Sequence, residues 1–412
     1  MEPAIYLDHN ATTPMLPEVS DAMRDCYAAP VLNPSSQHAY GRRARQMLED
    51  ARERIGELLG ASMTGRDADR AVFTSGGTEA NNLAVRGLLE AGEESRVGTA
   101  HRQRNVESPQ VGNAHPVRFG RLILSAVEHP SIYRLAEHLA RAGWQVEQLG
   151  VDAQGVIRVG LLPEIMQADT RLVCAILGQN ETGALQPVAD LAAICHDHNV
   201  PLHTDAAQVV GKLPVDFRAL GATTMSVAAH KFHGPPGIGA LVVRHGVELA
   251  PQLFGGFQQA GLRPGTESVA LVVGMLRALE LWHAERDERA ARLARLRDRL
   301  EQAVCQGWPA AVVLASGAPR LPHTANIAFV GLDRQALFMA LDQAGIACST
   351  GSACASGSSE PSPALLAMGC DEAVAGSALR FSLGATTSAA EVDAAARRIL
   401  AVCNELRRQK QA

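Results

Sequence analysis

The sequence places one thiol, Cys354, in a run of small and polar residues from Ser349 to Ser362. This run contains too many serines and glycines to form a core strand or a stable helix. Free cysteine usually packs in the core, so a thiol in such a run is better suited to reaching another group. We therefore expect Cys354 to be exposed and movable, with an incidental surface cysteine as the alternative.

A lysine and an aspartate each follow an apolar run that is typical of a strand. Lys231 stands between such a run and the prolines and glycines of residues 234–237. Lysine is normally solvated, so one held in a rigid apolar turn indicates a lowered pKa and imine chemistry, although a surface lysine in a tight turn gives the same pattern. Asp205 ends another apolar run, where an unpaired charge is costly to bury. It requires a cationic partner, and a pyridinium nitrogen would serve.

A glycine turn at Gly76 and Gly77 separates a predicted strand from a helix that starts at Thr78. Backbone N–H groups and the Thr78 hydroxyl could bind a phosphate there. The pattern lacks the spacing of a Walker loop or a dinucleotide fingerprint. His129 ends another strand, where it could also cap the next helix. A phosphate-binding turn, a carboxylate and a lysine in this order meet the needs of pyridoxal phosphate.

The region from about residue 70 to residue 245 predicts a sheet that could position these side chains. Short β-prone runs alternate there with helical patterns, as in a mainly parallel α/β sheet. The predicted strands are 71–75, 121–126, 171–177, 200–204, 225–228 and 239–243, and the helices between them include 131–142 and 188–198. Active groups gather beyond the carboxyl ends of such strands, where His129, Asn180, Asp205 and Lys231 all fall.

Two domains are expected. Residues 1–20 would join the small domain, 21–267 would form the large cofactor-binding domain, and 268–412 would supply the small C-terminal domain with Cys354. Residues 268–305 form one helical pattern that would bridge the two, and 324–330, 334–344, 379–383 and a helix from Ser388 follow it. The polar residues 93–120 predict a long surface loop, in which His101 and His115 are solvated rather than metal-bound.

Composition and charge exclude several classes of function. The net charge of -5 is small for 412 residues and no long basic stretch is present, so nucleic acid is not an expected partner. No signal sequence and no apolar run of membrane-spanning length is visible, so no membrane partner is expected and the protein should stay in the cytoplasm. The eight cysteines form no Cys-x-x-Cys pair, and no metal site is expected. Cys348 is expected to be structural, with a secondary role in handling sulfur as the alternative.

Nearly the whole chain resembles the cysteine desulfurases of the class V aminotransferase family, and most closely their nitrogen-fixation and iron–sulfur-cluster group. The resemblance rests on residues 6–13, 125–129, 179–183, 203–208, 230–231, 263–267, 352–354 and 380–384. It implies the fold-type I architecture, with a large domain around a mainly parallel seven-stranded sheet and a smaller α+β domain. It also implies a homodimer that converts L-cysteine to L-alanine and passes sulfur to an acceptor protein, such as a cluster scaffold or sulfur carrier.

The resemblance assigns a role to each matching residue. Lys231 would form the Schiff base with pyridoxal phosphate and remove the α proton, and the Cys354 thiolate would take the sulfur as a persulfide. His129 would stack on the ring and serve in proton transfer, Asp205 would keep the ring nitrogen protonated, and Gln208 would contact the ring hydroxyl. The remaining assignments are the phosphate ligands Gly77, Thr78, His230 and, from the second subunit, Thr266, and the substrate-carboxylate ligands Asn180 and Arg380.

The chain also departs from the family pattern. Ala228 stands where relatives often have a serine that bonds the phosphate. Phe257 replaces a glycine, and Gln259 and Ala260 replace a Glu-Arg pair, which puts the local geometry of the dimer interface in doubt. Two other class V reactions remain open: amino-group transfer, which would give Cys354 no role, and selenocysteine cleavage. A cofactor-binding scaffold without turnover is a further alternative.

Overall fold

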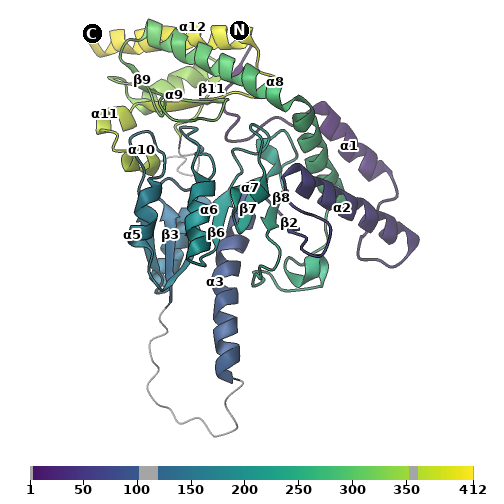
Figure 1. Cartoon of the computed structure of the whole chain (residues 1–412). Coiled ribbons are helices and arrows are strands. Elements are labelled where there is room, and N and C mark those ends of the chain that lie inside the picture. The colour runs from purple at the N-terminus through teal and green to yellow at the C-terminus, as the bar shows by residue number, and fades with distance from the viewer. Residues whose placement is uncertain (1–2, 102–118, 352–360, 412) are drawn as a thin grey trace.

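The computed structural model describes residues 3–101, 119–351 and 361–411, and its centre is a seven-stranded sheet in the order β2-β8-β7-β6-β5-β3-β4 (Figure 1). The strands are β2 (Arg70–Thr74), β3 (Arg121–Ser125), β4 (Gln145–Leu149), β5 (Thr170–Cys174), β6 (Leu202–Asp205), β7 (Thr224–Ala228) and β8 (Gly239–Val243). The five strands from β7 to β4 are parallel, and β8 runs antiparallel to both of its neighbours. The expected α/β fold with a mainly parallel sheet is confirmed.

The burial of each strand follows its place in the sheet. β3, β7 and β8 are buried along their whole length, as in strands covered by helices on both faces. β4 is polar and partly exposed, with Gln145 and Gln148 facing solvent. It lies at the edge of the sheet, and the sequence analysis missed it because a short polar edge strand resembles a loop.

Helices follow the strands of this sheet and cover it. They are α3 (Gly77–His101), α4 (Pro130–Arg141), α5 (Leu162–Ile165), α6 (Val188–Asp197) and α7 (Phe217–Leu220). α4 shows the usual pattern, because Ile132, Leu135, Ala136 and Leu139 form one buried stripe. α1 (Pro17–Ala28) and α2 (Ala39–Leu58) instead pack on α8 (Val269–Gly307).

The prediction of a surface loop over residues 93–120 is wrong for residues 93–101, which are helical. α3 continues to His101 instead of ending near Glu93. The residues after Gly92 include glutamates and an arginine and no proline, so the backbone can stay helical. His115 and the rest of 102–118 lie outside the described residues.

α8 leads away from the large sheet to a second group of elements (Figure 1). This group holds the antiparallel sheet β12-β10-β9, the two-stranded sheet β1-β11 and several helices. Its members are β1 (Ile5–Tyr6), β9 (Ala311–Val313), β10 (Thr324–Phe329), β11 (Ile346–Ala347), β12 (Ala378–Ser382), α9 (Arg334–Gln343), α10 (Pro363–Ala367), α11 (Glu372–Ala375) and α12 (Ala389–Gln411). β1 pairs in parallel with β11, so the N-terminal residues lie within this group.

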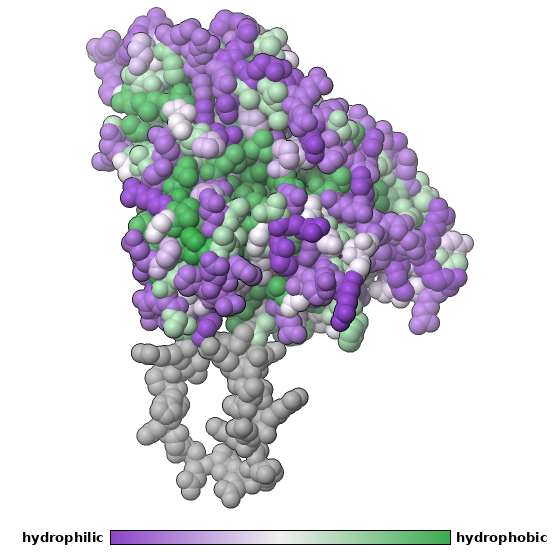
Figure 2. All heavy atoms as spheres, in the orientation of Figure 1, coloured by the Kyte–Doolittle hydropathy of each residue, from purple (hydrophilic) through white to green (hydrophobic). Residues whose placement is uncertain are grey.

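The two largest apolar clusters within the described residues differ in place, although the larger also takes in Ala328, Leu365 and Ala378 of the second group. The larger core surrounds the seven-stranded sheet and includes Phe73, Val173 and Phe217, whereas the smaller includes Phe329 and Phe381. Figure 2 shows hydrophilic residues over α1 and α2 and hydrophobic residues gathered toward the centre of this face. Within the described residues, no helix has the length and hydrophobicity needed to cross a membrane.

Candidate active site

A cavity of about 270 Å³ opens at the carboxyl ends of β5, β6 and β7. Predicted site residues line it, namely Gly77, Thr78, His129, Asn180, Asp205, Gln208, His230, Lys231 and Arg380. The unpredicted residues that join them are Asn10, Ala11, Asn81, Ile176 and Ala207. Segments far apart in the sequence therefore converge on one cavity, because parallel strands deliver their carboxyl ends to one edge of the sheet.

Lys231 lies on a short 3-10 turn, η2 (Ala229–Lys231), directly after β7. Its Nζ atom donates hydrogen bonds to the backbone oxygens of Asn10 at 2.6 Å and Ala11 at 2.9 Å. The N-terminal segment therefore holds this amine at the cavity. Sequence reasoning missed both partners because a backbone carbonyl carries no side-chain signal.

The same N-terminal segment braces the turn that carries Lys231. Thr13 Oγ1 donates to the backbone oxygen of His230 at 2.8 Å and accepts from the backbone N–H of His233 at 2.6 Å. Burial, together with the charges of Lys231 and Lys212, lowers the pKa of His230 to about 4. His230 is therefore neutral near pH 7, and it would meet an anion as a hydrogen-bonding group rather than as a charge.

Asp205 ends β6 with its carboxylate buried and held on both oxygens. Its Oδ2 accepts from Asn81 Nδ2 at 2.7 Å and its Oδ1 from the backbone N–H of Ala207 at 2.9 Å. Asn81 Oδ1 in turn lies 3.0 Å from Nε2 of His203, and burial lowers the pKa of His203 to about 4. A neutral imidazole donates to that amide oxygen, so the Asn81 amide is oriented with its N–H groups toward Asp205.

His129 occupies the position just before α4 and caps that helix. Its Nδ1 accepts from the backbone N–H of Ser131 at 3.2 Å and lies 2.8 Å from the Ser131 hydroxyl. Burial lowers the pKa of His129, with the Asp205 carboxylate opposing the shift and the Lys231 charge adding to it. The cap and the site role are thus compatible, because Nδ1 faces the helix and the neutral ring still lines the cavity.

The glycine turn between β2 and α3 packs tightly against the end of β7. A Cβ atom on Gly77 would lie 3.4 Å from the Cβ atom of Ala228. Glu79, in the first turn of α3, accepts from the backbone N–H of Ser75 at 2.6 Å and pairs with Arg263 at 2.8 Å. The turn that was predicted to hold a phosphate is therefore fixed on two sides.

Gln259, which together with Ala260 replaces a Glu-Arg pair of the family pattern, bonds the backbone of β2. The Gln259 side chain accepts from the backbone N–H of Phe73 at 2.6 Å and donates to the backbone oxygen of Phe73 at 2.8 Å. Phe73 belongs to β2, an edge strand, so this amide satisfies backbone groups that a neighbouring strand would otherwise bond. Gln259 and Ala260 both have left-handed backbone angles, with φ of 48° and 59°. The side-chain contacts of Gln259 thus hold it in a backbone conformation that residues other than glycine rarely adopt.

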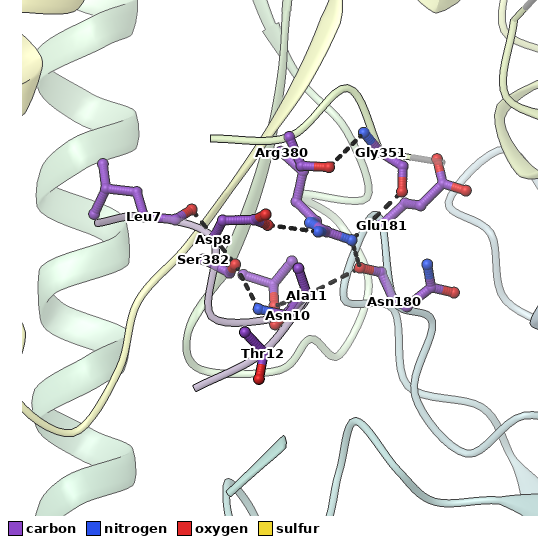
Figure 3. A network of polar contacts seen from close by, with 12 residues as sticks. Leu7, Asp8, Asn10, Ala11, Thr12, Asn180, Glu181, Gly351, Arg380 and Ser382 are labelled. Carbon is purple, nitrogen blue, oxygen red and sulfur yellow. Dashed lines mark hydrogen bonds and ion pairs between the residues drawn. The ribbon is translucent and has the colours of Figure 1, made fainter. Parts of the chain in front are cut away.

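Arg380 and Asn180 both line the cavity, and Figure 3 shows the polar contacts around them. Arg380, on β12, is 1% exposed and pairs through Nη2 with Asp8 Oδ1 at 2.7 Å. Its Nη1 donates to the backbone oxygen of Asn180 at 3.0 Å and, more weakly, to that of Gly351 at 3.4 Å. One guanidinium therefore joins the N-terminal segment, the large-sheet region and the start of the run that contains Cys354.

One predicted residue, Thr266, does not line this cavity. Thr266 lies beside a separate hollow of about 210 Å³, together with residues of α1 and the segment after it. Cys354 lies outside the described residues. The neighbouring thiol Cys348 is 6% exposed in the smaller core, and burial, with a contribution from Asp8, raises its pKa to about 12. Cys348 is therefore an un-ionised core residue near pH 7.

Comparisons with known proteins agree with this arrangement. The family model of aminotransferase class V matches residues 5–106 and 98–395. An IscS-like cysteine desulfurase of Mycobacterium tuberculosis is 40% identical over 397 residues, which are 95% of this chain and 94% of the relative. The cysteine desulfurase NifS of Azotobacter vinelandii is 35% identical, over 98% of this chain and 93% of the relative.

A solved structure shows the same architecture. The NifS-like protein from Rickettsia africae superposes with a TM-score of 0.83 at 28% identity, over 97% of this chain and 99% of that chain. The sequence match, the fold and the placement of the predicted residues in one cavity all point the same way. The chain therefore belongs to the class V aminotransferase family, within which its relatives are cysteine desulfurases.

Proposed function

We propose that the protein is a pyridoxal-phosphate-dependent cysteine desulfurase, which converts L-cysteine to L-alanine and carries the released sulfur as a persulfide on Cys354. The observation that carries this proposal is the cavity in which Lys231, Asp205, His129 and Arg380 converge. A lysine amine, a buried carboxylate and a neutral imidazole serve covalent cofactor chemistry, while the arginine suits a substrate carboxylate. The acceptor would be a protein of iron–sulfur cluster assembly or of another sulfur-delivery route.

The residues present fit the cofactor. The first turn of α3, with Gly77 and Thr78, and the neutral His230 suit its phosphate. Gln208 Oε1 is buried and has no partner within the described part of the chain, so it can accept from a ring hydroxyl. Asp205, held by Asn81, suits a protonated ring nitrogen. Pyridoxal phosphate, when bound, supplies an aldehyde for the Lys231 amine and a ring that stores the electron pair of a broken carbon–hydrogen bond.

The protein's own residues would then bind the substrate and move its protons. Arg380 and Asn180 hold the carboxylate of L-cysteine, and Lys231 removes the proton from the α carbon. His129 is neutral, so it can exchange a proton with the substrate. The Cys354 thiolate attacks the substrate sulfur, an S–S bond forms as the C–S bond breaks, and the remaining three-carbon product takes up protons and leaves as L-alanine.

The proposed enzyme is a homodimer in which each subunit contributes to the site of the other. Thr266 lies outside the cavity of its own chain, which is compatible with service at the phosphate of a partner subunit in a homodimer. The division into residues 1–20, 21–267 and 268–412 and the location in the cytoplasm also stay predictions. The smaller apolar core supports the division, because all of its members lie within residues 1–20 and 268–412.

The decisive experiment incubates the cofactor-loaded protein with L-cysteine, measures L-alanine and sulfide, and maps the extra sulfur by peptide mass spectrometry. Wild type should gain one sulfur atom on Cys354. C354A should keep the cofactor absorbance and lose sulfide release, whereas K231A should lose alanine formation as well. Sulfide release retained by C354A would contradict the proposal. In a parallel incubation with L-selenocysteine, release of selenium together with no sulfide from L-cysteine would assign the selenocysteine reaction.

A further inference from the structure

Arg380 already pairs with one carboxylate of the protein itself, that of Asp8. A guanidinium has five N–H donors. Nη1 uses its two on the backbone oxygens of Asn180 and Gly351, and Nη2 uses one on Asp8 Oδ1 (Figure 3). The buried Nε–H has no partner within the described residues. Nε and the second N–H of Nη2 therefore remain for another acceptor, on the edge of the guanidinium that suits a bidentate carboxylate.

The position of Asp8 is set by its backbone and does not depend on Arg380. Asp8 forms a parallel bridge with Ser382 on β12, the strand that also carries Arg380. The backbone N–H of Ser382 donates to Leu7 at 2.7 Å, and that of His9 donates back to Ser382 at 3.3 Å. Asp8 thus stands beside Arg380 whether or not a ligand is present.

We propose that Asp8 is a specificity-determining residue, an internal carboxylate that shares Arg380 with the substrate carboxylate and weakens its binding. The inference deepens the proposed function and rests on it for the identity of the substrate. Asp8 pairs with a cation that is 1% exposed. A ligand with one carboxylate can still use the free edge of Arg380, but it binds against the repulsion of Asp8.

Two opposing effects decide the result of removing this charge. Loss of Asp8 would free one N–H of Arg380, but Nη1 would still be held by Asn180 and Gly351. The repulsion between two carboxylates on one guanidinium would disappear, and inside a poorly solvated cavity this repulsion is much stronger than in water. The electrostatic gain should exceed the cost of a less firmly oriented Arg380 guanidinium, so a ligand with a carboxylate should bind more tightly.

The test uses the cofactor-loaded protein and isothermal titration calorimetry with L-alanine and ethylamine, which differ in the carboxylate. D8N should bind L-alanine about tenfold more tightly than wild type, with ethylamine unchanged. D8S, which also removes the charge, should behave in the same way, and D8E should stay near wild type. D393N provides the matched control, because Asp393 also pairs with an arginine, Arg299, but does not line the cavity.

Weaker or unchanged binding of L-alanine by folded D8N and D8S would overturn the proposal, and so would equal tightening of ethylamine. Cofactor absorbance and thermal unfolding establish that each variant is folded, and D8S serves if D8N is not. Failure here is distinguishable from failure of the proposed function, since the latter would show as wild-type protein that releases no sulfide from L-cysteine.

Discussion

Asn81 on α3 donates a hydrogen bond to Asp205 at the end of β6, with Nδ2 and Oδ2 separated by 2.7 Å. The same Nδ2 donates to the Ser131 hydroxyl at 2.8 Å, and the Asn81 oxygen faces His203 at 3.0 Å. All four side chains are buried. The carboxylate is thus held by a polar network at the cavity, and this network ties β6 to the first turns of α3 and α4.

Replacement of Asp205 by asparagine should lower kcat by about 100-fold or more, because an amide cannot stabilise a positive charge on a ring nitrogen. The variant keeps the size of the side chain and one acceptor for Asn81, so thermal unfolding should change little. Steady-state alanine production measures the effect. D190N, on the exposed face of α6, is the control and should retain wild-type kcat.

Replacement of Ala228 by serine should tighten cofactor binding. Ala228 is 2% exposed, lines the cavity and lies beside Gly77, so a hydroxyl there would add a donor to the phosphate site. A hydrogen bond to a charged group should lower the Kd of the cofactor by about tenfold. Absorbance titration of the apoprotein with pyridoxal phosphate measures this. A228C, with a weak donor of similar size, should stay near wild type, and equal tightening by both variants would rule out the hydrogen bond as the cause.

The folded state should lose stability steeply as the pH falls from about 6.5 to 4. Burial lowers the pKa of His9 to about 3 and those of His203 and His233 to about 4. The unfolded chain holds these groups near pKa 6.5, so it binds more protons than the folded state in this window, and each group removes up to about 1.4 kcal/mol per pH unit.

Urea denaturation of the cofactor-loaded protein at pH 7, 6 and 5 measures this dependence. H203N should flatten it, because one proton fewer is then taken up on unfolding. H198Q, at an exposed position, should leave the slope unchanged. Equal slopes for wild type and H203N would show that His203 titrates alike in both states.

Replacement of Cys348 by alanine should leave turnover within about twofold of wild type. The thiol is buried, and its pKa of about 12 keeps it un-ionised, so it should not accept sulfur. The variant should lose about 1 to 2 kcal/mol of unfolding free energy, because a small group is removed from a packed core. Peptide mapping after exposure to L-cysteine checks the chemistry, and a persulfide on Cys348 would contradict it.

Replacement of Phe254 and Phe257 by serine should weaken the proposed homodimer. These aromatic side chains are 88% and 92% exposed, and such exposure on neighbouring residues marks an interaction surface. They lie in the segment that leads to Thr266, so a second copy of the chain is the expected cover. Light scattering over a dilution series should show a dimer for wild type and a shift toward monomer for the double variant. Substitution of the exposed Leu366, on α10, should have no effect.

The sequence alone determined six of the seven strands of the large sheet and much of the cavity. β-prone runs such as Gly239–Val243 match their observed bounds, because apolar residues bounded by turns have few other stable structures. Asp205 and Lys231 were found because a charge at the end of a buried run is costly unless a partner group compensates it. The resemblance added Asn180, Gln208 and Arg380, all of which line the cavity.

Only the tertiary structure decided which groups hold these residues. Asn81, Asn10 and Asp8 carry no local signal, since each acts through a partner from a distant segment. The course of α3 past Glu93 and the edge strand β4 were likewise missed, because polar sequence can be helix, strand or loop until its surroundings are known. Sequence patterns report what each residue needs, such as burial or a counter-charge, whereas folding decides which neighbour supplies it.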